Sequence, residues 1–286
     1  MGRFEQAALQ CSERAEASGA LVPLETSRVE LSGCEPFVLR QLLSDTPKHL
    51  RSAGPKPNPF LPWDAALEVE RLGQSHVLIL NKFPVQRGHL LLISQSWQPQ
   101  AGWLSSADWQ RVAEVEADTQ GLWFFNSCAE AGASQPHRHL QLLPRRSGEA
   151  SCPLAAQFLA QLAGTAPPWP WRYQLSRRQC SGSGSREAAA ELEQLYRQHS
   201  QALGLGEPST AAVPRQPYNL LFDRHWLLTV QRCQEHWAGF SVNALGFAGY
   251  LLVTPGSDQQ WLQQHTPLAL LEAVAVRRDQ QQGSAG

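Results

Sequence analysis

The chain has 286 residues and a formal net charge of −1, because its 24 lysines and arginines are balanced by 25 aspartates and glutamates. This length can bury a sizeable core in one large domain or in two coupled units. The charge balance disfavours a protein that coats nucleic acid, which needs a strongly basic surface, but it leaves a small polyphosphate ligand open, because a few local cations and backbone donors can bind one.

Cysteine usage and the N-terminal sequence predict a cytoplasmic protein. None of the six cysteines belongs to a Cys-x-x-Cys pair, the spacing typical of zinc ribbons and redox motifs, so free thiols in a reducing cytosol are expected. The first residues lack the apolar core of a signal peptide, and no run approaches the roughly 18 apolar residues of a membrane span. We therefore expect neither a membrane partner nor a nucleic-acid partner.

The first predicted elements precede a long irregular stretch. A helix is predicted over 4–18 and ends at Gly19, an extended segment follows over 20–31, and a short apolar run covers 37–43. The proline-rich stretch 46–64 precludes regular structure. Its lysine and apolar residues are equally compatible with a ligand contact and with a cover over the core.

The middle of the chain alternates strand pairs with a helix. Apolar runs at 75–81 and 89–94 predict an antiparallel pair, and a second pair is predicted for 122–126 and 137–143. Between the pairs, 105–120 begins with the N-cap-like sequence Ser-Ser-Ala-Asp and carries apolar residues at helical spacing. Strands, helix and strands in this order indicate an α+β fold with a mainly antiparallel sheet flanked by helices.

A change in composition divides the chain into two parts. The range 166–186 reads Pro-Pro-Trp-Pro-Trp and then a Ser/Gly-rich stretch, which predicts a mobile linker between an N-terminal part, 1–165, and a C-terminal part, 187–279. The elements predicted for the C-terminal part are a helix over 186–203, a strand pair over 218–222 and 226–230, a Gly-containing strand or helix segment over 240–254, and a last helix over 266–279.

Two histidines and a glutamine alternate within the sequence FFNSCAEAGASQPHRHLQLL, residues 124–143. Because side chains alternate along a strand, His137, His139 and Gln141 are predicted to project from one face and Arg138 from the other. Small residues precede them in a loop that can bring backbone N–H groups close to an anion. The pattern indicates an imidazole nucleophile that faces a phosphate.

A metal site is the alternative interpretation of the paired histidines. Zinc would need further ligands, and glutamine is a poor one, so we predict no metal site. A histidine with an ordinary pKa near 6.5 is largely neutral at cytosolic pH, which is the state that a nucleophile needs.

The sequence GASQPHRHLQ, with LNKFPV before it and SVNALGFAGYLLV after it, resembles the diadenosine tetraphosphate phosphorylases, also called ATP adenylyltransferases, of the histidine triad superfamily. The resemblance extends from GALVPLE near the N-terminus to Val253. The His-x-His-x-Gln core is similar to that of the transferase branch, whereas the hydrolase branch has a third histidine at the position of Gln141. The resemblance implies a histidine-triad-like fold.

The resemblance also implies a mechanism. In such enzymes the second histidine of the motif, here His139, attacks the α-phosphorus of the dinucleotide and forms a nucleotidyl-histidine intermediate. ATP leaves first, and inorganic phosphate then attacks the adenylyl group and releases ADP. Gln141 would donate its amide hydrogen bond to a phosphoryl or leaving oxygen, and His137 would orient the site. Adenylyl transfer involving ADP-sulfate is an implied side activity.

Residues around the motif match family positions that contact the substrate. The resemblance implies this role for Lys56, Asn81, Lys82, Asn126, Gly132, Ala133, Ser134, Gln135, Ser241 and Asn243. The structural alternatives are a solvated surface charge for either lysine and a capped turn for the last two residues. A divalent cation, Mg²⁺ or Mn²⁺, is expected to arrive with the substrate, because no cluster of carboxylates is evident, and no organic cofactor is expected.

Two stretches depart from the family pattern. Phe125 to Ala129 replaces a passage expected to be richer in glycine, and Val230 to Cys233 stands where a proline-arginine pair is expected. The second departure leaves the position of a cation in the C-terminal part open. Two other functions are alternatives: a hexose-phosphate uridylyltransferase, which is disfavoured because Arg138 stands where proline is usual, and a catalytically idle nucleotide-binding protein. The sequence sets no oligomeric state.

Overall fold

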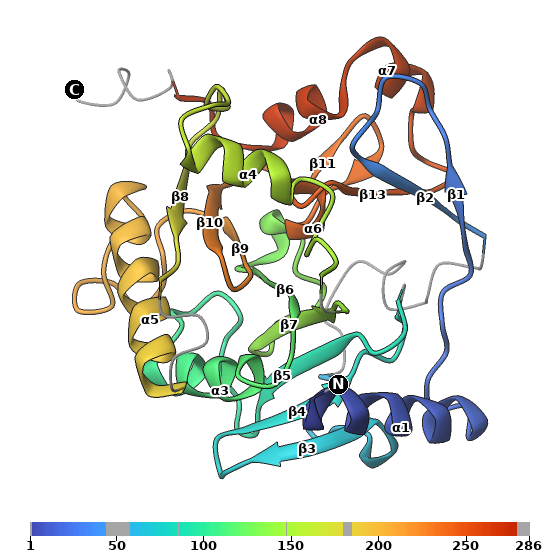
Figure 1. The fold of residues 1–286 in the computed structure, drawn as a ribbon, viewed down its shortest axis with the longest axis vertical. Helices are drawn as coiled ribbons and strands as arrows, with labels where there is room; N and C mark the ends of the chain where they lie inside the picture. The colour runs from blue at the N-terminus through green and yellow to red at the C-terminus, as the bar shows by residue number, and fades with distance from the viewer. Residues whose placement is uncertain (1, 44–57, 85, 147, 180–184, 279–286) are drawn as a thin grey trace.

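One eight-stranded antiparallel sheet organises the molecule, as the computed structural model in Figure 1 shows. The structure describes residues 2–43, 58–84, 86–146, 148–179 and 185–278. In spatial order the strands are β3 (Glu68–Leu72), β4 (His76–Leu80), β5 (Leu90–Ser94), β7 (His139–Pro144), β6 (Gly121–Asn126), β9 (Tyr218–Phe222), β10 (Trp226–Gln231) and β8 (Tyr173–Arg177). The predicted α+β fold with a mainly antiparallel sheet is confirmed.

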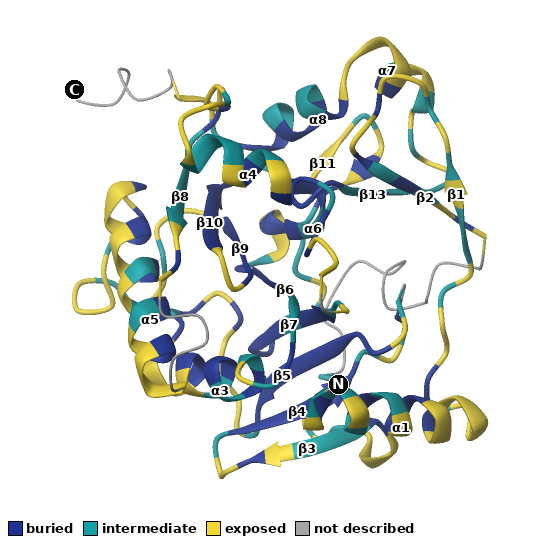
Figure 2. Ribbon diagram, in the orientation of Figure 1, coloured by how far each residue is buried: buried dark blue, intermediate teal, exposed yellow. Residues whose placement is uncertain are grey.

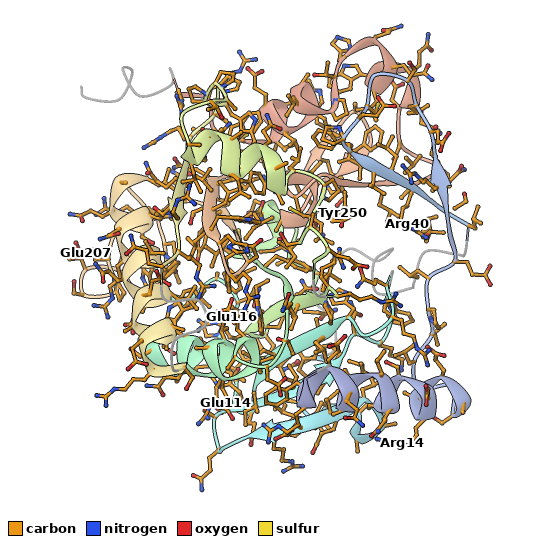
Figure 3. The ribbon with its side chains drawn as sticks, viewed as in Figure 1. Arg14, Arg40, Glu114, Glu116, Glu207 and Tyr250 are labelled. Atoms are coloured by element: carbon orange, nitrogen blue, oxygen red, sulfur yellow. The ribbon has the colours of Figure 1, made fainter. Side chains whose placement is uncertain are left out.

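Two smaller sheets lie beside the main one. The first joins β1 (Thr26–Val29), β2 (Val38–Leu42) and β13 (Tyr250–Val253), and its β2–β13 pair is parallel. The second is a short antiparallel pair of β11 (His236–Trp237) and β12 (Phe240–Ser241). Tyr250, labelled in Figure 3, accepts a 2.7 Å hydrogen bond from Arg145, which follows β7 and so ties the two sheets together.

Helices cover both faces of the main sheet. One apolar core contains side chains from α1 (Arg3–Ala17), α3 (Ser106–Glu116) and α5 (Ser185–Ala202). The core on the opposite face contains side chains from α4 (Ala155–Leu162), α6 (Ala244–Phe247), α7 (Gln259–Gln264) and α8 (Pro267–Val274). Two short 3-10 helices, η1 (Ala65–Leu67) and η2 (Ala129–Ala131), complete the elements. Figure 2 shows the central strands buried and the outer faces of α1 and α5 exposed.

The two faces of the sheet follow from alternation along its strands. In β6, Trp123 and Phe125 point into the core of α1, α3 and α5, whereas Leu122 and Phe124 point into the other core. In β7, Leu140 and Leu142 join the first core, which leaves its polar side chains on the second face. The His-x-His-x-Gln motif therefore lies on the face that carries α6.

The N-terminus of α3 is stabilised as its sequence predicts. Ser105 and Asp108 form a reciprocal capping box, in which each side chain accepts a hydrogen bond from the backbone N–H of the other. Such a cap contributes about 1 kcal/mol of helix stability. The helix ends at Glu116 rather than at the predicted residue 120.

The range expected to be a linker contains a strand. β8 pairs with β10 over its full length, and the preceding Trp169 and Trp171 are buried. Proline and serine in the flanking sequence concealed the strand, because its side chains are half-buried and do not alternate clearly. Residues 180–184 of this range lie outside the described part of the chain.

Other elements also differ from the predicted ones. Strand β3 was not predicted, and α8 ends at Val274 instead of continuing to 279. The chain becomes extended there because Ala275 and Arg277 form bridges with Arg232 and Trp171. Within the described residues, we find no helix with the length and apolar character that a membrane crossing requires.

Candidate active site

His139 begins β7, and its neighbours fix both the position and the tautomer of its ring. Its backbone N–H donates to Gln100 Oε1 at 2.8 Å, and its ring Nδ1 lies 2.8 Å from the carbonyl oxygen of His137. Because a carbonyl only accepts, Nδ1 carries the proton and Nε2 carries the lone pair. Burial lowers the pKa of His139 to about 4, well below the ordinary value expected from sequence. The ring is therefore neutral near pH 7.

Gln100 holds the backbone on both sides of the motif. Its Nε2 donates to the carbonyl oxygen of Asn126 at 2.7 Å and to that of His139 at 3.3 Å. Its own backbone N–H donates to the carbonyl oxygen of Pro136 at 2.8 Å. One buried amide thus joins the end of β6 to the start of β7. Sequence reasoning missed this residue, because nothing in its local pattern marks it.

His137 uses both of its ring nitrogens within the protein. Nε2 lies 2.8 Å from the carbonyl oxygen of Ser94 and 2.9 Å from the hydroxyl of the same residue. Nδ1 lies 2.9 Å from Nδ2 of Asn58, which can only donate. Nε2 therefore carries the proton and donates it to Ser94. These bonds suit a residue that orients the site, as the resemblance implies.

Aromatic rings surround the two histidines. The centroid of Phe60 lies 5.7 Å from that of His137 and 5.4 Å from that of His139. Trp97 makes an edge contact with His137 at 5.4 Å between ring centroids, and 51% of its surface is exposed. The imidazoles therefore have apolar walls, which explains why burial dominates their lowered pKa values.

The opposite face of the motif is anchored by charge. Arg138 donates to Asp108 Oδ2 at 3.1 Å, and His76 Nε2 lies 3.0 Å from the other oxygen of that carboxylate. Although burial raises the pKa of Asp108, the hydrogen bond from His76 and the charge of Arg138 bring it below its ordinary value. The predicted alternation of His139 and Arg138 between faces is confirmed.

Gln141 is held in one orientation by a chain of hydrogen bonds. The backbone N–H of Phe83 donates to Asn81 Oδ1 at 3.0 Å, so Nδ2 of Asn81 is the atom that donates to Nδ1 of His89, at 3.2 Å. Nε2 of His89 then carries the proton and donates to Gln141 Oε1 at 3.0 Å. The amide NH₂ of Gln141 is thereby left to donate elsewhere.

The same chain gives Asn81 a role within the protein. Its side chain joins Phe83 to His89, and its expected contact with the substrate stays a prediction. His89 itself was not among the predicted site residues. Burial lowers the pKa of His89 to about 4, which keeps its ring neutral and its donor and acceptor nitrogens distinct.

Asn126 ends β6 on the same face as Phe124, whose ring lies 5.9 Å from that of His89. Its Oδ1 accepts hydrogen bonds from Asn219 Nδ2 at 2.8 Å and from the backbone N–H of Ala244 at 2.9 Å. Both partners come from the C-terminal part of the chain. Asn126 therefore lies on the same face of the two central strands β6 and β7 as His139 and Gln141.

The loop that carries η2 uses most of its early N–H groups internally. The N–H groups of Ala131 and Ala133 donate to the carbonyl oxygen of Cys128, and that of Gly132 donates to Ala129. The N–H groups of Gly132 and Ala133, which were expected to face an anion, are therefore already used within the loop, and contact of these two residues with the substrate stays a prediction. Ser134 is exposed, and Oε1 of Gln135 is buried without a hydrogen-bond partner in the described residues.

Gly132 is required by the packing of this loop. Its φ is +86°, in the left-handed region that favours glycine, and an added Cβ would lie 2.6 Å from Cβ of Asn243. Asn243 caps α6, because its Oδ1 accepts a 2.9 Å hydrogen bond from the N–H of Leu245. The predicted loop and the predicted C-terminal contact region therefore touch each other.

The remaining candidates are exposed or lie outside the described residues. The hydroxyl of Ser241 donates to Glu235 Oε1 at 2.6 Å. Lys82 is exposed, and Lys56 lies outside the described residues. No group of three or more His, Cys, Asp or Glu side chains within the described ranges is placed to hold a metal ion. A divalent cation that arrives with the substrate stays a prediction.

Two family models match the chain. The model described as the Ap4A phosphorylase N-terminal domain matches residues 1–160, and the model described as the ATP adenylyltransferase C-terminal domain matches residues 167–277. The strand β8, within the expected linker, falls inside the second range. Together the two matches include every motif residue on which the resemblance rests.

Curated relatives and solved structures agree with the family models. Two proteins of Saccharomyces cerevisiae, Protein APA1 and diadenosine 5',5'''-P1,P4-tetraphosphate phosphorylase 2, are each 34% identical over 77 residues, a stretch that spans 24% of either relative. The crystal structure of yeast Ap4A phosphorylase Apa2 has a TM-score of 0.71 at 18% identity, with 97% of this chain and 95% of that chain covered. Its complex with Ap4A gives 0.71 at 17% identity, with 97% and 98% covered.

At such identity the structural likeness shows the fold, here the histidine-triad-like fold that the resemblance implied. Family membership rests on the sequence models, of which the first alone matches more than half of the chain. This chain belongs to the family of Ap4A phosphorylases and ATP adenylyltransferases.

Proposed function

We propose that this protein catalyses the reversible phosphorolysis of diadenosine tetraphosphate to ATP and ADP through an adenylyl group on His139. The observation that carries this proposal is the tautomer of His139: Nδ1 donates to the carbonyl of His137, so Nε2 carries the lone pair that can attack phosphorus. Family membership supplies the substrate class, since the related yeast enzymes are named for Ap4A.

The reaction consists of two displacements at one phosphorus atom. Nε2 of His139 forms a bond to an α-phosphorus while the bond from that phosphorus to the bridging oxygen breaks, and ATP leaves with this oxygen. An oxygen of inorganic phosphate then forms a bond to the same phosphorus, the N–P bond breaks, and ADP leaves. Nε2 recovers its lone pair, so the enzyme returns to its starting state.

Two neighbours support the charge changes in these steps. The imidazole becomes positively charged when Nε2 is adenylylated, and the carbonyl oxygen of His137, 2.8 Å from Nδ1, stabilises that charge. Gln141, whose Oε1 is occupied by His89, offers its NH₂ to a phosphoryl or leaving oxygen. An amide has no acidic proton to exchange, so Gln141 does not activate water as a histidine could. Phosphate is therefore the expected acceptor.

Product analysis tests the proposal. The protein is incubated with diadenosine tetraphosphate and Mg²⁺, with and without inorganic phosphate, and nucleotides are resolved by chromatography. ATP plus ADP should appear in multiple turnovers only when phosphate is present. ATP plus AMP, or two ADP, in the absence of phosphate would identify a hydrolase, and no turnover would favour a nucleotide-binding protein.

A matched pair of variants assigns the nucleophile. His139→Asn should abolish turnover, because an amide nitrogen cannot replace the imidazole. His225→Asn is the control, since His225 is an exposed residue in the turn after β9, at the far end of the strand from the residues around Asn219. Normal turnover by His139→Asn would overturn the assignment. Omission of Mg²⁺ with addition of a chelator tests the expected divalent cation in the same assay.

A further inference from the structure

The amide of Asn126 is held through its oxygen atom, which determines where its NH₂ points. Oδ1 accepts hydrogen bonds from Asn219 Nδ2 at 2.8 Å and from the N–H of Ala244 at 2.9 Å. Both partners can only donate, so the atom between them must be oxygen. The NH₂ group of Asn126 is therefore turned away from these partners. The backbone of Asn126 shares the amide of Gln100 with His139, which places this residue beside the nucleophile.

Asn219 has no freedom to flip its own amide. Its Nδ2 donates both hydrogens, one to Asn126 Oδ1 and one to the carbonyl oxygen of Ala131, each at 2.8 Å. Its Oδ1 accepts from Nη1 of Arg232. Asn219 is fully buried and stands directly opposite Asn126 in the β6–β9 register. A reversed amide would oppose NH₂ to a guanidinium and oxygen to a carbonyl.

Arg232 determines the orientation of the Asn219 amide, and through it that of the Asn126 amide. It is fully buried, and its five N–H hydrogens have uncharged oxygen acceptors: the side chain of Asn219 and the backbone carbonyls of Ala131, Gln234, Val242 and Val274. Burial lowers the pKa of Arg232 to about 10, so the guanidinium remains charged near pH 7. A guanidinium is a donor at every position. Its contact with Asn219 therefore fixes which atom of that amide faces it.

We propose that Arg232 and Asn219 are positioning residues, which act through Asn126 by fixing its amide with the NH₂ directed at an acceptor oxygen of the substrate. The inference rests on the proposed adenylyl transfer and adds the origin of one donor in that site. The acceptor is a phosphoryl or ribose oxygen of the nucleotide, since these oxygens accept hydrogen bonds and the NH₂ only donates. Arg232 is a buried cation in the C-terminal part of the chain, within the stretch 230–233 where the sequence left the position of a cation open.

Loss of the fixed orientation has a measurable cost. Without Asn219, Oδ1 of Asn126 accepts only from the N–H of Ala244, and the amide can rotate. The substrate then loses a preorganised hydrogen bond. A hydrogen bond of this kind corresponds to roughly a 10- to 100-fold change in kcat/KM. The loss should appear in kcat/KM for diadenosine tetraphosphate and in the affinity for AMP.

A double-mutant cycle tests the proposal. We measure Asn126→Ala, Asn219→Ala and the double variant for kcat/KM with diadenosine tetraphosphate and for AMP affinity by calorimetry. If Asn219 acts through Asn126, the second substitution should add little to the first. Multiplied losses in the double variant, or an Asn219→Ala variant as active as the wild type, would overturn the positioning role.

Two further variants separate positioning from folding. Asn219→Asp keeps an acceptor for Arg232 but loses the donors to Asn126 and to Ala131, so it should lose at least as much kcat/KM as Asn219→Ala while circular dichroism at the assay temperature shows a folded protein. Tyr196→Phe removes a buried hydrogen bond to Tyr218 on the other face of the sheet and should lose stability without the kinetic defect. Asn219→Asp with full activity contradicts the proposal.

The readouts distinguish this inference from the proposed function. A wild-type protein that binds AMP without turnover refutes the phosphorolysis, and the cycle on AMP affinity then decides whether Asn219 positions Asn126. A wild-type protein that neither turns over diadenosine tetraphosphate nor binds AMP refutes both. Turnover by the wild type with independent losses in the cycle refutes the positioning role alone.

Discussion

At His139 the backbone of the neighbouring histidine and the burial of the ring act in the same direction. The carbonyl of His137 holds the proton on Nδ1, and burial disfavours a second proton on Nε2. The proposed nucleophile is therefore kept neutral, with its lone pair on Nε2, without a carboxylate partner at Nδ1. An ordinary strand histidine would lose that state as the pH falls through 6.5.

This pKa predicts how the rate of the first chemical step depends on pH below neutrality. Because the pKa of His139 is lowered to about 4, the rate of adenylyl transfer to His139 in a single turnover should stay nearly constant from pH 8 to about pH 5. Stopped-flow or quenched-flow measurement of ATP release checks this expectation. A limb centred near pH 6.5 would contradict it and indicate a solvated imidazole.

The positions of the motif residues could be predicted from the sequence, but the contacts that orient them could not. Alternation predicted that His137, His139 and Gln141 share a face, because strand geometry is local. The residues that orient them, among them Gln100 and His89, come from other strands and loops, and a single sequence carries no signal for such long-range contacts. The hydrogen bonds of Asn81 to Phe83 and His89 could not be predicted for the same reason.

At the scale of elements, the loop around η2 and the N-terminus of α6 form one packed unit. Gly132 lies against Asn243, and Ala244 donates to Asn126, so the two segments support the same corner of the site. This contact depends on a residue without a side chain at a position where φ is +86°. A change at Gly132 should therefore move α6 as well as the loop.

A pair of glycine substitutions tests this contact. Gly132→Ala adds both a left-handed alanine, which costs about 1 kcal/mol, and a 2.6 Å clash with Asn243. Gly164→Ala is the control, because its φ is +72° and nothing lies within 4 Å of an added Cβ. Gly132→Ala should lower the melting temperature more and reduce kcat/KM at least tenfold. Equal effects of the two variants on both quantities would show that the contact is unimportant.

Local pairs were the elements that the sequence predicted well. The pairs β4–β5, β6–β7 and β9–β10 each join two strands that are close in the sequence, and all three form as predicted. β8 was missed because composition suggested a linker and because its partner β10 is distant in the sequence. The placement of β7 between β5 and β6 is likewise a non-local feature that no local pattern reveals.

At the scale of the whole molecule, the two parts matched by different family models share one sheet and one site. β6 from the first pairs with β9 from the second, and α3 packs against α5. Arg178 donates two hydrogen bonds, 2.6 and 2.7 Å long, to Glu116, which Figure 3 labels at the end of α3. The site is completed only where the parts meet, because Asn126 is oriented by Asn219.

Burial of three histidines makes the folding stability of the protein depend on pH. The pKa values of His89, His139 and His199 are each lowered to about 4 by desolvation. The unfolded chain binds these protons near pH 6.5 and the folded chain does not, so the stability present above pH 6.5 is lost as the pH falls toward 4. Each histidine contributes a slope of about 1.4 kcal/mol per pH unit in that window.

Chemical denaturation between pH 7.5 and 4.5 measures this dependence. His199 lies away from the candidate site, where its ring contacts the hydroxyls of Ser176 and Thr229. His199→Gln should therefore reduce the slope by about one proton while catalysis at pH 7 is retained. A slope unchanged by this substitution would contradict the lowered pKa of His199.

The account depends most directly on a covalent bond at one atom. The protein is mixed with diadenosine tetraphosphate and Mg²⁺ without phosphate, quenched, digested and mapped by mass spectrometry under conditions that preserve phosphoramidates. We expect one adenylyl group on the peptide that contains His139, its absence in His139→Asn, and its release as ADP when phosphate is added before the quench. An adenylyl group on another residue, or full turnover without any labelled peptide, would contradict the account.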